Sequence, residues 1–297
     1  MEVKKGRREM KKFELTTEFI TNALGKKLFR IKALVEFGSV KAGELGGYAE
    51  KEENISQDGN AWVSGDARVY GNAWVYGNAW VSGDAWVHGN AKVFGNAEVY
   101  GDTEVSGDAK VFGNARVSDN VRVSDNAKVF GNAEVYGDAK VSDNAKVFGN
   151  AKVYGDAKVS DNAKVFGNAE VYGDAKVYGN AWVSGDAWVH GNAKVFGNAW
   201  VYGDTEVSGD AKVSDNAEVS GDADYALVKG FGTEFRCTTF YRDKNKKIMV
   251  NCGCFHGDLE AFRKQVKETR SGKIAKEYLM IADLMEYHFT SEDSSDE

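Results

Sequence analysis

The chain repeats a six-residue pattern without interruption from Gly59 to Asp224. Each hexad reads Gly or Asp, then Asn or Asp, then Ala, a variable residue, Val, and a second variable residue. The valine recurs at 27 consecutive positions from Val63 to Val219, and only three of the 28 alanine positions hold another residue: Thr103, Val121 and Thr205. A period of six does not match the roughly 3.6-residue turn of an α-helix, which also disfavours β-branched valine. The repeat therefore excludes a helical fold and predicts short strands.

The hexad itself predicts a strand followed by a corner. In Ala-x-Val the alanine and valine side chains point to one face of a strand, and the variable side chain points to the other. The second variable residue, an aromatic residue or Ser, also points outward, and the Gly-Asn or Asp-Asn type pair after it tolerates a positive φ, as a tight corner requires. A chain that alternates strand and corner in this way coils into a solenoid, and each rung bonds to the next about 4.8 Å along the axis. Alanine and valine then form the core.

A longer repeat of 18 residues sets the number of sides. Residues 125–142 recur almost unchanged as residues 143–160 and 161–178. Three hexads therefore make one coil, and the predicted fold is mainly β: a three-sided parallel β-helix. Positions 18 residues apart should stack, and charges of alternating sign suit neighbouring rungs. The expected columns include one of phenylalanines (Phe94, Phe112, Phe130, Phe148, Phe166), one of alternating charge (Glu98, Arg116, Glu134, Lys152, Glu170) and one of like charge (Lys92, Lys110, Lys128, Lys146, Lys164).

Two segments, Val-Ser-Asp-Asn-Val-Arg-Val at 117–123 and Val-Ser-Asp-Asn-Ala-Lys-Val at 141–147, resemble the hexapeptide repeat of left-handed parallel β-helices. Many acyltransferases share that architecture. The left hand is implied by this resemblance and not by the periodicity, since right-handed crossovers are the general rule. The whole chain resembles phage- and prophage-encoded hexapeptide-repeat proteins of uncharacterised function, in which segments like residues 37–47 and 252–262 flank the repeats. The resemblance implies an architecture but no reaction, substrate or ligand.

The sequence divides into four expected regions: an N-terminal cap (1–58), the repeat (59–224), a C-terminal α+β cap (225–290) and a disordered acidic tail (291–297). The N-terminal cap has two alternating runs, from Lys12 and from Leu28, that predict a β-hairpin.

The C-terminal cap is expected to be a small ββαα unit. Runs at 235–241 and 247–252 predict a second hairpin. Asp258 can then cap a helix that ends near Thr269. A second helix follows, with one apolar face traced by Ile274, Tyr278, Ile281, Met285 and His288.

Charge and composition restrict the function. The net charge is −7, and residues 59–224 alone carry −9, which disfavours the basic groove that nucleic acid needs. We expect no membrane span, since no apolar run approaches the ~18–20 residues required. Met1 to Lys12 is polar and basic, unlike a secretory signal, and three cysteines favour a reducing compartment. The expected location is the cytoplasm, that of a bacterial host if the chain is phage-encoded.

An acyltransferase of the resembled fold needs a general-base histidine beside a groove, and the repeat offers two histidines. His88 and His190 stand in outward positions that usually hold Tyr, Phe or Ser, and no inserted loop adjoins either. Residues 77–112 also recur as residues 179–214 at an offset of 17 hexads, which moves the copy to another face. A catalytic site would lose its neighbours at that offset. We therefore expect surface histidines, no catalytic residue and no cofactor.

Seven tryptophans are the most unusual feature of the predicted surface. All occupy the variable position between Ala and Val, which should face outward. Exposed aromatic side chains mark binding surfaces, although they also suit strands and pack against caps. The candidate binding residues are Trp62, Trp74, Trp80, Trp86, Trp182, Trp188 and Trp200. A protein partner or self-association is favoured, and a carbohydrate is the further alternative.

The C-terminal cap holds the remaining candidates. Cys237, Cys252, Cys254 and His256 are residue types that bind zinc, but Cys252 and Cys254 are separated by one residue and not by the usual two to four. No metal is expected, and buried or reactive thiols are favoured. Three lysines on the hairpin turn predict a solvated tip or a phosphate contact: Lys244, Lys246 and Lys247.

The sequence thus favours a non-enzymatic structural, scaffold or binding protein that acts through the outer faces and caps of a β-helix. The alternative is an enzyme similar to the hexapeptide-repeat acyltransferases.

Overall fold

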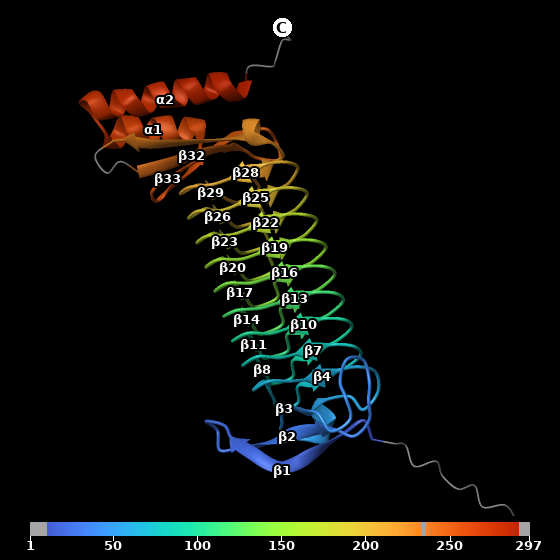
Figure 1. Ribbon diagram of the computed structural model, residues 1–297. Helices are drawn as coiled ribbons and strands as arrows, with labels where there is room; N and C mark the ends of the chain where they lie inside the picture. The colour runs from blue at the N-terminus through green and yellow to red at the C-terminus, as the bar shows by residue number, and fades with distance from the viewer. Residues whose placement is uncertain (1–10, 233–235, 291–297) are drawn as a thin grey trace, which may run out of the picture. The chain divides into compact units, whose positions relative to one another are not determined.

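The computed structural model describes residues 11–232 and 236–290. Each hexad of the repeat contributes one two-residue strand, made of its variable residue and its valine. These strands are β4 (Trp62–Val63) to β30 (Glu218–Val219), and each begins six residues after the one before it. The chain forms two compact units, Met1–Gly137 and Asp138–Glu297. In both units the repeat winds as a three-sided left-handed parallel β-helix (Figure 1).

Strands 18 residues apart pair in parallel, which confirms three hexads per coil. β4, for example, pairs with β7 (Trp80–Val81), and β7 pairs with β10 (Glu98–Val99). The repeat sheets of the first unit have the orders β5-β8-β11-β14, β4-β7-β10-β13-β16 and β6-β9-β12-β15. Those of the second unit are β17-β20-β23-β26-β29, β19-β22-β25-β28 and β18-β21-β24-β27-β30.

The core is the predicted set of alanines and valines. Every valine of the hexad series from Val63 to Val219 is fully buried. Burying a side chain of this kind contributes roughly 1.5–3 kcal/mol, so the valine columns hold the coils together. Thr103 and Thr205 are also buried, and their hydroxyls donate to the carbonyls of Tyr100 and Tyr202 at 2.7 and 2.8 Å. These bonds satisfy the two polar groups that replace alanine in the core.

The corners have the predicted left-handed backbone. Most are glycines, but five are aspartates with φ between 57° and 64°: Asp119, Asp125, Asp143, Asp161 and Asp215. A Cβ is costly in this region of φ. Asp119, Asp143 and Asp161 gain a compensating bond to the next coil; Asp161 Oδ2, for example, accepts from the Gly179 N–H at 2.9 Å.

Outward side chains form the predicted columns within each unit. Phe94 and Phe112 stack with ring centroids 4.8 Å apart, as do Phe148 and Phe166 at 4.9 Å. Lys152 Nζ contacts Glu170 Oε1 at 3.1 Å in the column of alternating charge. Lys146 lies opposite Lys164 in the column of like charge.

The N-terminal cap contains the predicted hairpin, β1 (Phe13–Thr21) and β2 (Lys27–Ala33), and a strand that the sequence did not indicate. This strand, β3 (Leu45–Ala49), pairs antiparallel with β2 and parallel with β5 (Arg68–Val69). Gly46 permits the close approach, because a Cβ there would lie 2.5 Å from both Ile31 Cγ1 and the Val63 carbonyl oxygen. A 3₁₀ turn, η1 (Glu52–Asn54), leads into the repeat.

Polar side chains of the N-terminal cap replace the missing preceding rung. The repeat ladder runs from an N–H of one coil to a carbonyl of the next, as from Trp62 N to Ala79 O at 3.0 Å. The carbonyls of the first coil therefore need other donors. Lys12 Nζ donates to Ala61 O at 2.9 Å, and Asn54 Nδ2 donates to Ala73 O at 2.8 Å. Burial lowers the pKa of Lys12 from 10.5 to about 8, although Asp58 raises it.

The C-terminal cap has four strands, so the predicted ββαα order was incomplete. After η2 (Asp222–Asp224), the strands are β31 (Tyr225–Phe231), β32 (Arg236–Arg242), β33 (Ile248–Cys252) and β34 (Phe255–Asp258). The two missed strands lie at the sheet edges, directly after the repeat and directly before the first helix. The helices follow as predicted, α1 (Leu259–Thr269) and α2 (Gly272–Thr290).

One face of this four-stranded sheet packs on the helices and the other on the last coil. Phe240 and Val250 join Phe262 in the core that the sheet forms with α1 and α2. On the other face, Tyr241 hydroxyl lies 3.0 Å from Ser214 Oγ, and burial raises the pKa of Tyr241 to about 12. The second helix buries Phe289 and leaves His288 exposed. The predicted apolar face is therefore wrong at its last residue, His288.

Acceptors on the cap meet the N–H groups of the last coil. Lys212 N donates to Thr239 Oγ1 at 3.0 Å, and Ser220 N donates to Asp224 Oδ2 at 2.9 Å. The predicted acidic tail, 291–297, lies outside the described residues. Neither described helix is long and apolar enough to cross a membrane.

Candidate functional site

The seven tryptophans do not form one surface, because the 18-residue coil distributes them over three sheets in the first unit and over two sheets in the second. Trp182 and Trp200 share the sheet that contains β24 (Trp182–Val183) and β27 (Trp200–Val201), whereas Trp188 lies on the sheet of β25 (Trp188–Val189). In the first unit, the tryptophans of β4 and β7, of β6 (Trp74–Val75) and of β8 (Trp86–Val87) lie on three different sheets. The duplicated segments indeed place their tryptophans on different faces.

Trp62 corrects the expectation that all seven side chains are exposed. It is fully buried under the N-terminal cap, where it makes edge contacts with Phe13 and Phe37 at centroid distances of 6.4 and 5.4 Å. Its position on the first coil explains the difference, since the cap covers that coil. Trp62 therefore supports the fold and belongs to no binding surface.

Trp182 and Trp200 form an aromatic platform on the second unit. Their rings stack in parallel with centroids 4.9 Å apart, and Phe166 meets Trp182 edge-on at 6.1 Å. Lys164 Nζ lies over the Trp182 ring, 4.0 Å from its centroid. Trp200 ends the stack, because the next residue in the column is Glu218, and its side chain stays 46% exposed.

Two hollows lie beside Trp200, each with a volume of about 260 Å³. The first is mainly aromatic and is lined by Phe166, Trp182, Ser184, Trp200, Tyr202 and Glu218. Tyr202 hydroxyl donates to Glu218 Oε1 at 2.9 Å, and this bond is the main cause of the raised pKa of Tyr202. The carboxylate is thereby fixed at the edge of the aromatic hollow.

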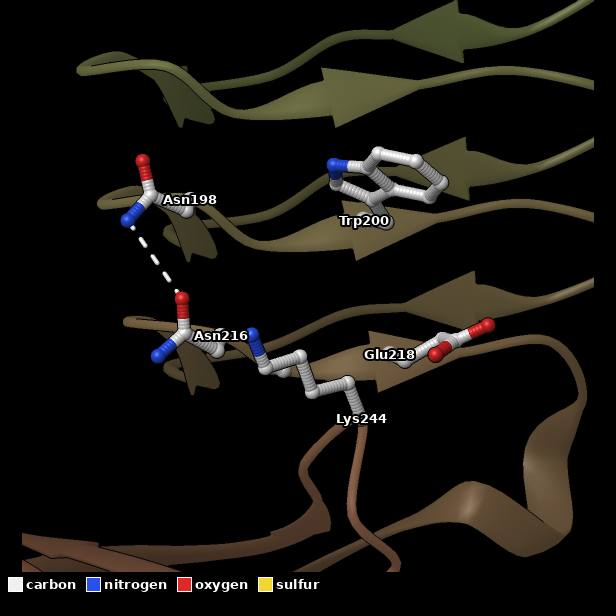
Figure 2. A pocket seen from close by; sticks show the side chains of 6 residues that line it. Asn198, Trp200, Asn216, Glu218 and Lys244 are labelled. Atoms are coloured by element: carbon white, nitrogen blue, oxygen red, sulfur yellow. Dashed lines mark hydrogen bonds between the residues drawn. The ribbon is translucent and has the colours of Figure 1, made fainter.

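The second hollow lies between the last coil and the C-terminal cap (Figure 2), and we call it the polar hollow because four of its six lining residues are polar: Asn198, Asn216, Glu218 and Lys244, beside Trp200 and Ala217. Asn198 Nδ2 donates to Asn216 Oδ1 at 3.4 Å, the last step of an amide ladder along the corner. Lys244 reaches this hollow from the turn between β32 and β33, where its N–H donates to Asn216 O at 3.0 Å. The Lys244 ammonium forms no ion pair with any residue in the described part of the chain.

We use the name Trp200 surface for Phe166, Trp182, Trp200, Tyr202, Glu218 and Lys244. The sequence indicated the two tryptophans and placed Lys244 on a turn tip. It did not indicate that this tip returns to the last coil, and neither Tyr202 nor Glu218 differs from ordinary residues of the hexad. No local sequence pattern indicates that Lys244 lies beside Trp200, because the path of the C-terminal cap depends on tertiary contacts.

The two repeat histidines are stacked and paired. His88 stacks on Tyr70 at 4.9 Å and lies 3.1 Å from Glu104 Oε1. His190 stacks on Tyr172 at 4.7 Å and lies 2.8 Å from Glu206 Oε1. Both histidines act here as members of outward columns, as the sequence indicated.

The four zinc-type residues of the C-terminal cap are not brought together. Cys252 packs with the helix-side core, while Cys254 is exposed in the turn before β34. His256 Nε2 contacts Asp215 Oδ2 at 2.6 Å and the Tyr241 hydroxyl at 3.2 Å, on the side of the last coil. Cys237 is half-buried, and burial raises its pKa. Across residues 11–232 and 236–290, no group of three or more His, Cys, Asp or Glu side chains could hold a metal ion.

The three lysines of the hairpin turn have different surroundings in the structure. Lys247 Nζ pairs with Asp258 Oδ2 at 2.6 Å, so it holds the start of α1 beside the turn. Only Lys244 of the three lines the polar hollow.

The match to one family model agrees with the repeat architecture. Residues 61–76, 73–89 and 175–191 match the YdcK beta solenoid repeat, so parts of both units are similar to that repeat family. The curated protein sequences contain no significant match to the chain. Among solved structures, LpxA from Acinetobacter baumannii is similar over 48% of this chain and 69% of its own, with 13% identity and a TM-score of 0.33. The chain is thus similar to a β-solenoid repeat family in short segments at two places in its repeat.

Proposed function

We propose that this chain is a non-enzymatic binding protein whose β-helix presents the Trp200 surface to a protein partner. The observation that carries the proposal is the exposed end of the Trp182–Trp200 stack, with a hollow of about 260 Å³ on either side. Tryptophan at the centre of such a surface is a frequent source of binding energy between proteins. The rest of the repeat serves as a scaffold that holds this surface rigidly.

The two hollows favour a protein segment over a sugar. The aromatic hollow suits an apolar side chain, since four of its six lining residues are aromatic. The polar hollow supplies the Lys244 ammonium and the amide groups of Asn198 and Asn216 beside the Glu218 carboxylate, a mixture of donors and acceptors that suits the amide or carbonyl group of a peptide. An apolar anchor beside a polar, charged group is the usual chemistry of a protein interface, with its apolar core and polar rim.

The test compares Trp200→Ala with Trp188→Ala in the full chain. Trp188 is a matched control, because it is 48% exposed and lies on another sheet. Each variant is used as bait in cells that produce the chain, and captured proteins are quantified by mass spectrometry. We expect a partner that binds the wild type and Trp188→Ala equally and binds Trp200→Ala at least about 30-fold more weakly, as loss of a central anchor implies.

Lys244→Glu provides a second, independent variant. It lies on an exposed turn and replaces the ammonium in the lining of the polar hollow with a carboxylate beside that of Glu218, so binding of the same partner should weaken. A partner that binds Trp200→Ala as well as Trp188→Ala would place the binding site elsewhere and contradict the proposal.

We also infer a bacterial cytoplasmic location and a phage or prophage origin. The support is the resemblance of the segments at 37–47 and 252–262 to phage-encoded repeat proteins, together with low cysteine use. Capture of the partner from lysogenic cells tests both statements, because the partner's own location and gene would be known.

A further inference from the structure

Two outward columns of the first unit have the order tryptophan, glutamate, arginine. In one column Trp80 lies opposite Glu98, and Glu98 lies opposite Arg116. The other column has the same order, in Trp86, Glu104 and Arg122. Each arginine reaches back to its glutamate, with Nε 3.5 Å from Oε2 in the first column and 3.8 Å in the second. The carboxylate that follows a tryptophan is thus neutralised by the next coil.

The column of Trp200 ends before this order is complete. Glu218 lies opposite Trp200, but β30 is the last strand of its sheet, so no rung supplies the third residue. The Tyr202 hydroxyl donates to Glu218 Oε1, and Oε2 has no partner among residues 11–232 and 236–290. Glu206, which follows Trp188 in the same unit, has its cation-forming partner in His190 at 2.8 Å. Glu218 therefore differs from these other glutamates in lacking such a partner.

Lys244 does not supply the missing charge. Figure 2 shows its ammonium directed toward Asn216 and the Glu218 carboxylate directed away from Lys244. The two residues form no ion pair in the described part of the chain, although both line the polar hollow. The corner beside the aromatic hollow adds negative charge, since the exposed Asp186 and Asp204 follow two of the residues that line it by two positions. The aromatic hollow is therefore bordered by carboxylates.

The Trp182–Trp200 stack already holds a cation on its other side. Lys164 Nζ lies 4.0 Å from the Trp182 centroid, on the ring face that Trp200 does not cover. The outer face of Trp200, toward Glu218, carries no cation from the described residues, and the side chain is 46% exposed. Cations are attracted to the ring face of tryptophan. An open tryptophan face beside a carboxylate without a cation is thus suited to a positively charged group.

We propose that the aromatic hollow receives an arginine side chain of the protein partner, whose guanidinium pairs with Glu218 and stacks on Trp200. This inference rests on the proposed function, because it names the group by which that partner is held. The methylene stem of arginine suits the apolar lining of the hollow. Its planar guanidinium stacks on aromatic faces and meets carboxylate oxygens in a fixed geometry, which favours arginine over lysine. The partner would then supply the residue that Arg116 supplies within the first unit.

Titration of the full chain with N-acetylarginine amide tests the hollow directly. Nuclear magnetic resonance resolves tryptophan indole N–H signals, and the Trp200 signal is the one that Trp200→Phe lacks. We expect arginine amide to shift this signal with a dissociation constant at least about tenfold lower than that of N-acetylcitrulline amide, which has nearly the same shape and no charge. Equal constants, or a Trp200 signal that arginine amide does not move, would overturn the inference.

Glu218→Gln and Glu98→Gln are a matched pair of variants. Each removes the carboxylate that follows a tryptophan and keeps the size of the side chain. Glu218→Gln should lose the preference for arginine amide over citrulline amide, and Glu98→Gln should keep it, because Glu98 is already paired with Arg116. Melting temperature is the folding control, since Glu218 is partly exposed. A preference that survives in Glu218→Gln would contradict the pairing.

Partner capture with Glu218→Gln separates this inference from the proposed function. We expect the captured partner to bind this variant at least about tenfold more weakly than the wild type. If the partner is lost from Trp200→Ala but binds Glu218→Gln as well as the wild type, the arginine is wrong and the Trp200 surface still stands. If the partner binds Trp200→Ala as well as the wild type, both the surface and its arginine are wrong.

Discussion

At the scale of single residues, the alternation within each hexad decides what a position can do. Lys146 and Val147 are neighbours in one two-residue strand, β18, yet the lysine is part of an outward column and the valine is fully buried. The backbone environment is the same for both residues. The direction of the side chain alone therefore sets the cost of a change.

Val147→Asp and Lys146→Asp should differ strongly in stability. The first places an unpaired carboxylate among alanines and valines and should cost several kcal/mol. The second changes a partly exposed position and should cost about 1 kcal/mol or less. Thermal melting of the two variants measures the difference. Equal shifts in melting temperature would mean that the inward and outward assignments are wrong.

At the scale of elements, the caps supply hydrogen-bond partners for the backbone groups that the first and last coils leave unpaired. Lys12 is an example in which the partner is a side chain and not the backbone of a further rung. Its ammonium replaces a backbone donor at Ala61 O and lies 4.8 Å from the centroid of the Phe37 ring. Burial of this charge lowers its pKa, so the cap should be sensitive to pH in a predictable direction.

The pH dependence of stability should separate wild type from Lys12→Met. The pKa of Lys12 is about 8 in the folded chain, against 10.5 for a lysine in its ordinary, unfolded surroundings. Below about pH 8 both states hold the proton; between the two values the unfolded state holds more, so stability rises with pH. We therefore expect the unfolding free energy of the wild type, relative to Lys12→Met, to increase from about pH 7 to about pH 10. Urea titrations at both pH values measure it, and a relative decrease would contradict the buried lysine.

The same elements show what could be predicted from the sequence. The repeat strands, their 18-residue pairing and both hairpins followed from local patterns, because each pattern acts within one coil or one turn. β3 and β31 did not, since they are stabilised by neighbours that the chain reaches only after folding. Trp62 and Lys244 show the same limit at the site. Trp62 is covered by the N-terminal cap, and Lys244 is positioned by the C-terminal cap. The hexad motif contains no information about either cap.

At the scale of the whole molecule, we expect the repeat to tolerate changes in length. The Trp200 surface uses residues from Phe166 to Lys244, all within the second unit. Hexads before Phe166 are therefore spacers with respect to this surface. Their number affects stability, because each coil adds a set of interfaces with its neighbours.

Deletion of Asp143–Ser160 should preserve partner binding at the Trp200 surface. The deletion removes one complete coil, keeps every later strand in its own sheet and joins Ser142 to Asp161 within the motif. Stability should fall by about one repeat-interface term. Binding to the captured partner and thermal melting measure the two effects. A deletion variant that folds normally but no longer binds would show that an earlier coil takes part in the site.

The contrast between Lys12 at one end of the repeat and Thr239 at the other has a consequence for assembly. The first coil ends in carbonyls that a donor must meet, and the last coil ends in N–H groups that an acceptor must meet. Bare ends would thus be complementary and would propagate head to tail, giving a filament with a direction. The two caps block the growth of such a filament at its two ends, one by supplying donors and the other by supplying acceptors. If the caps were exchanged, donors would face donors and acceptors would face acceptors, and neither end would be blocked.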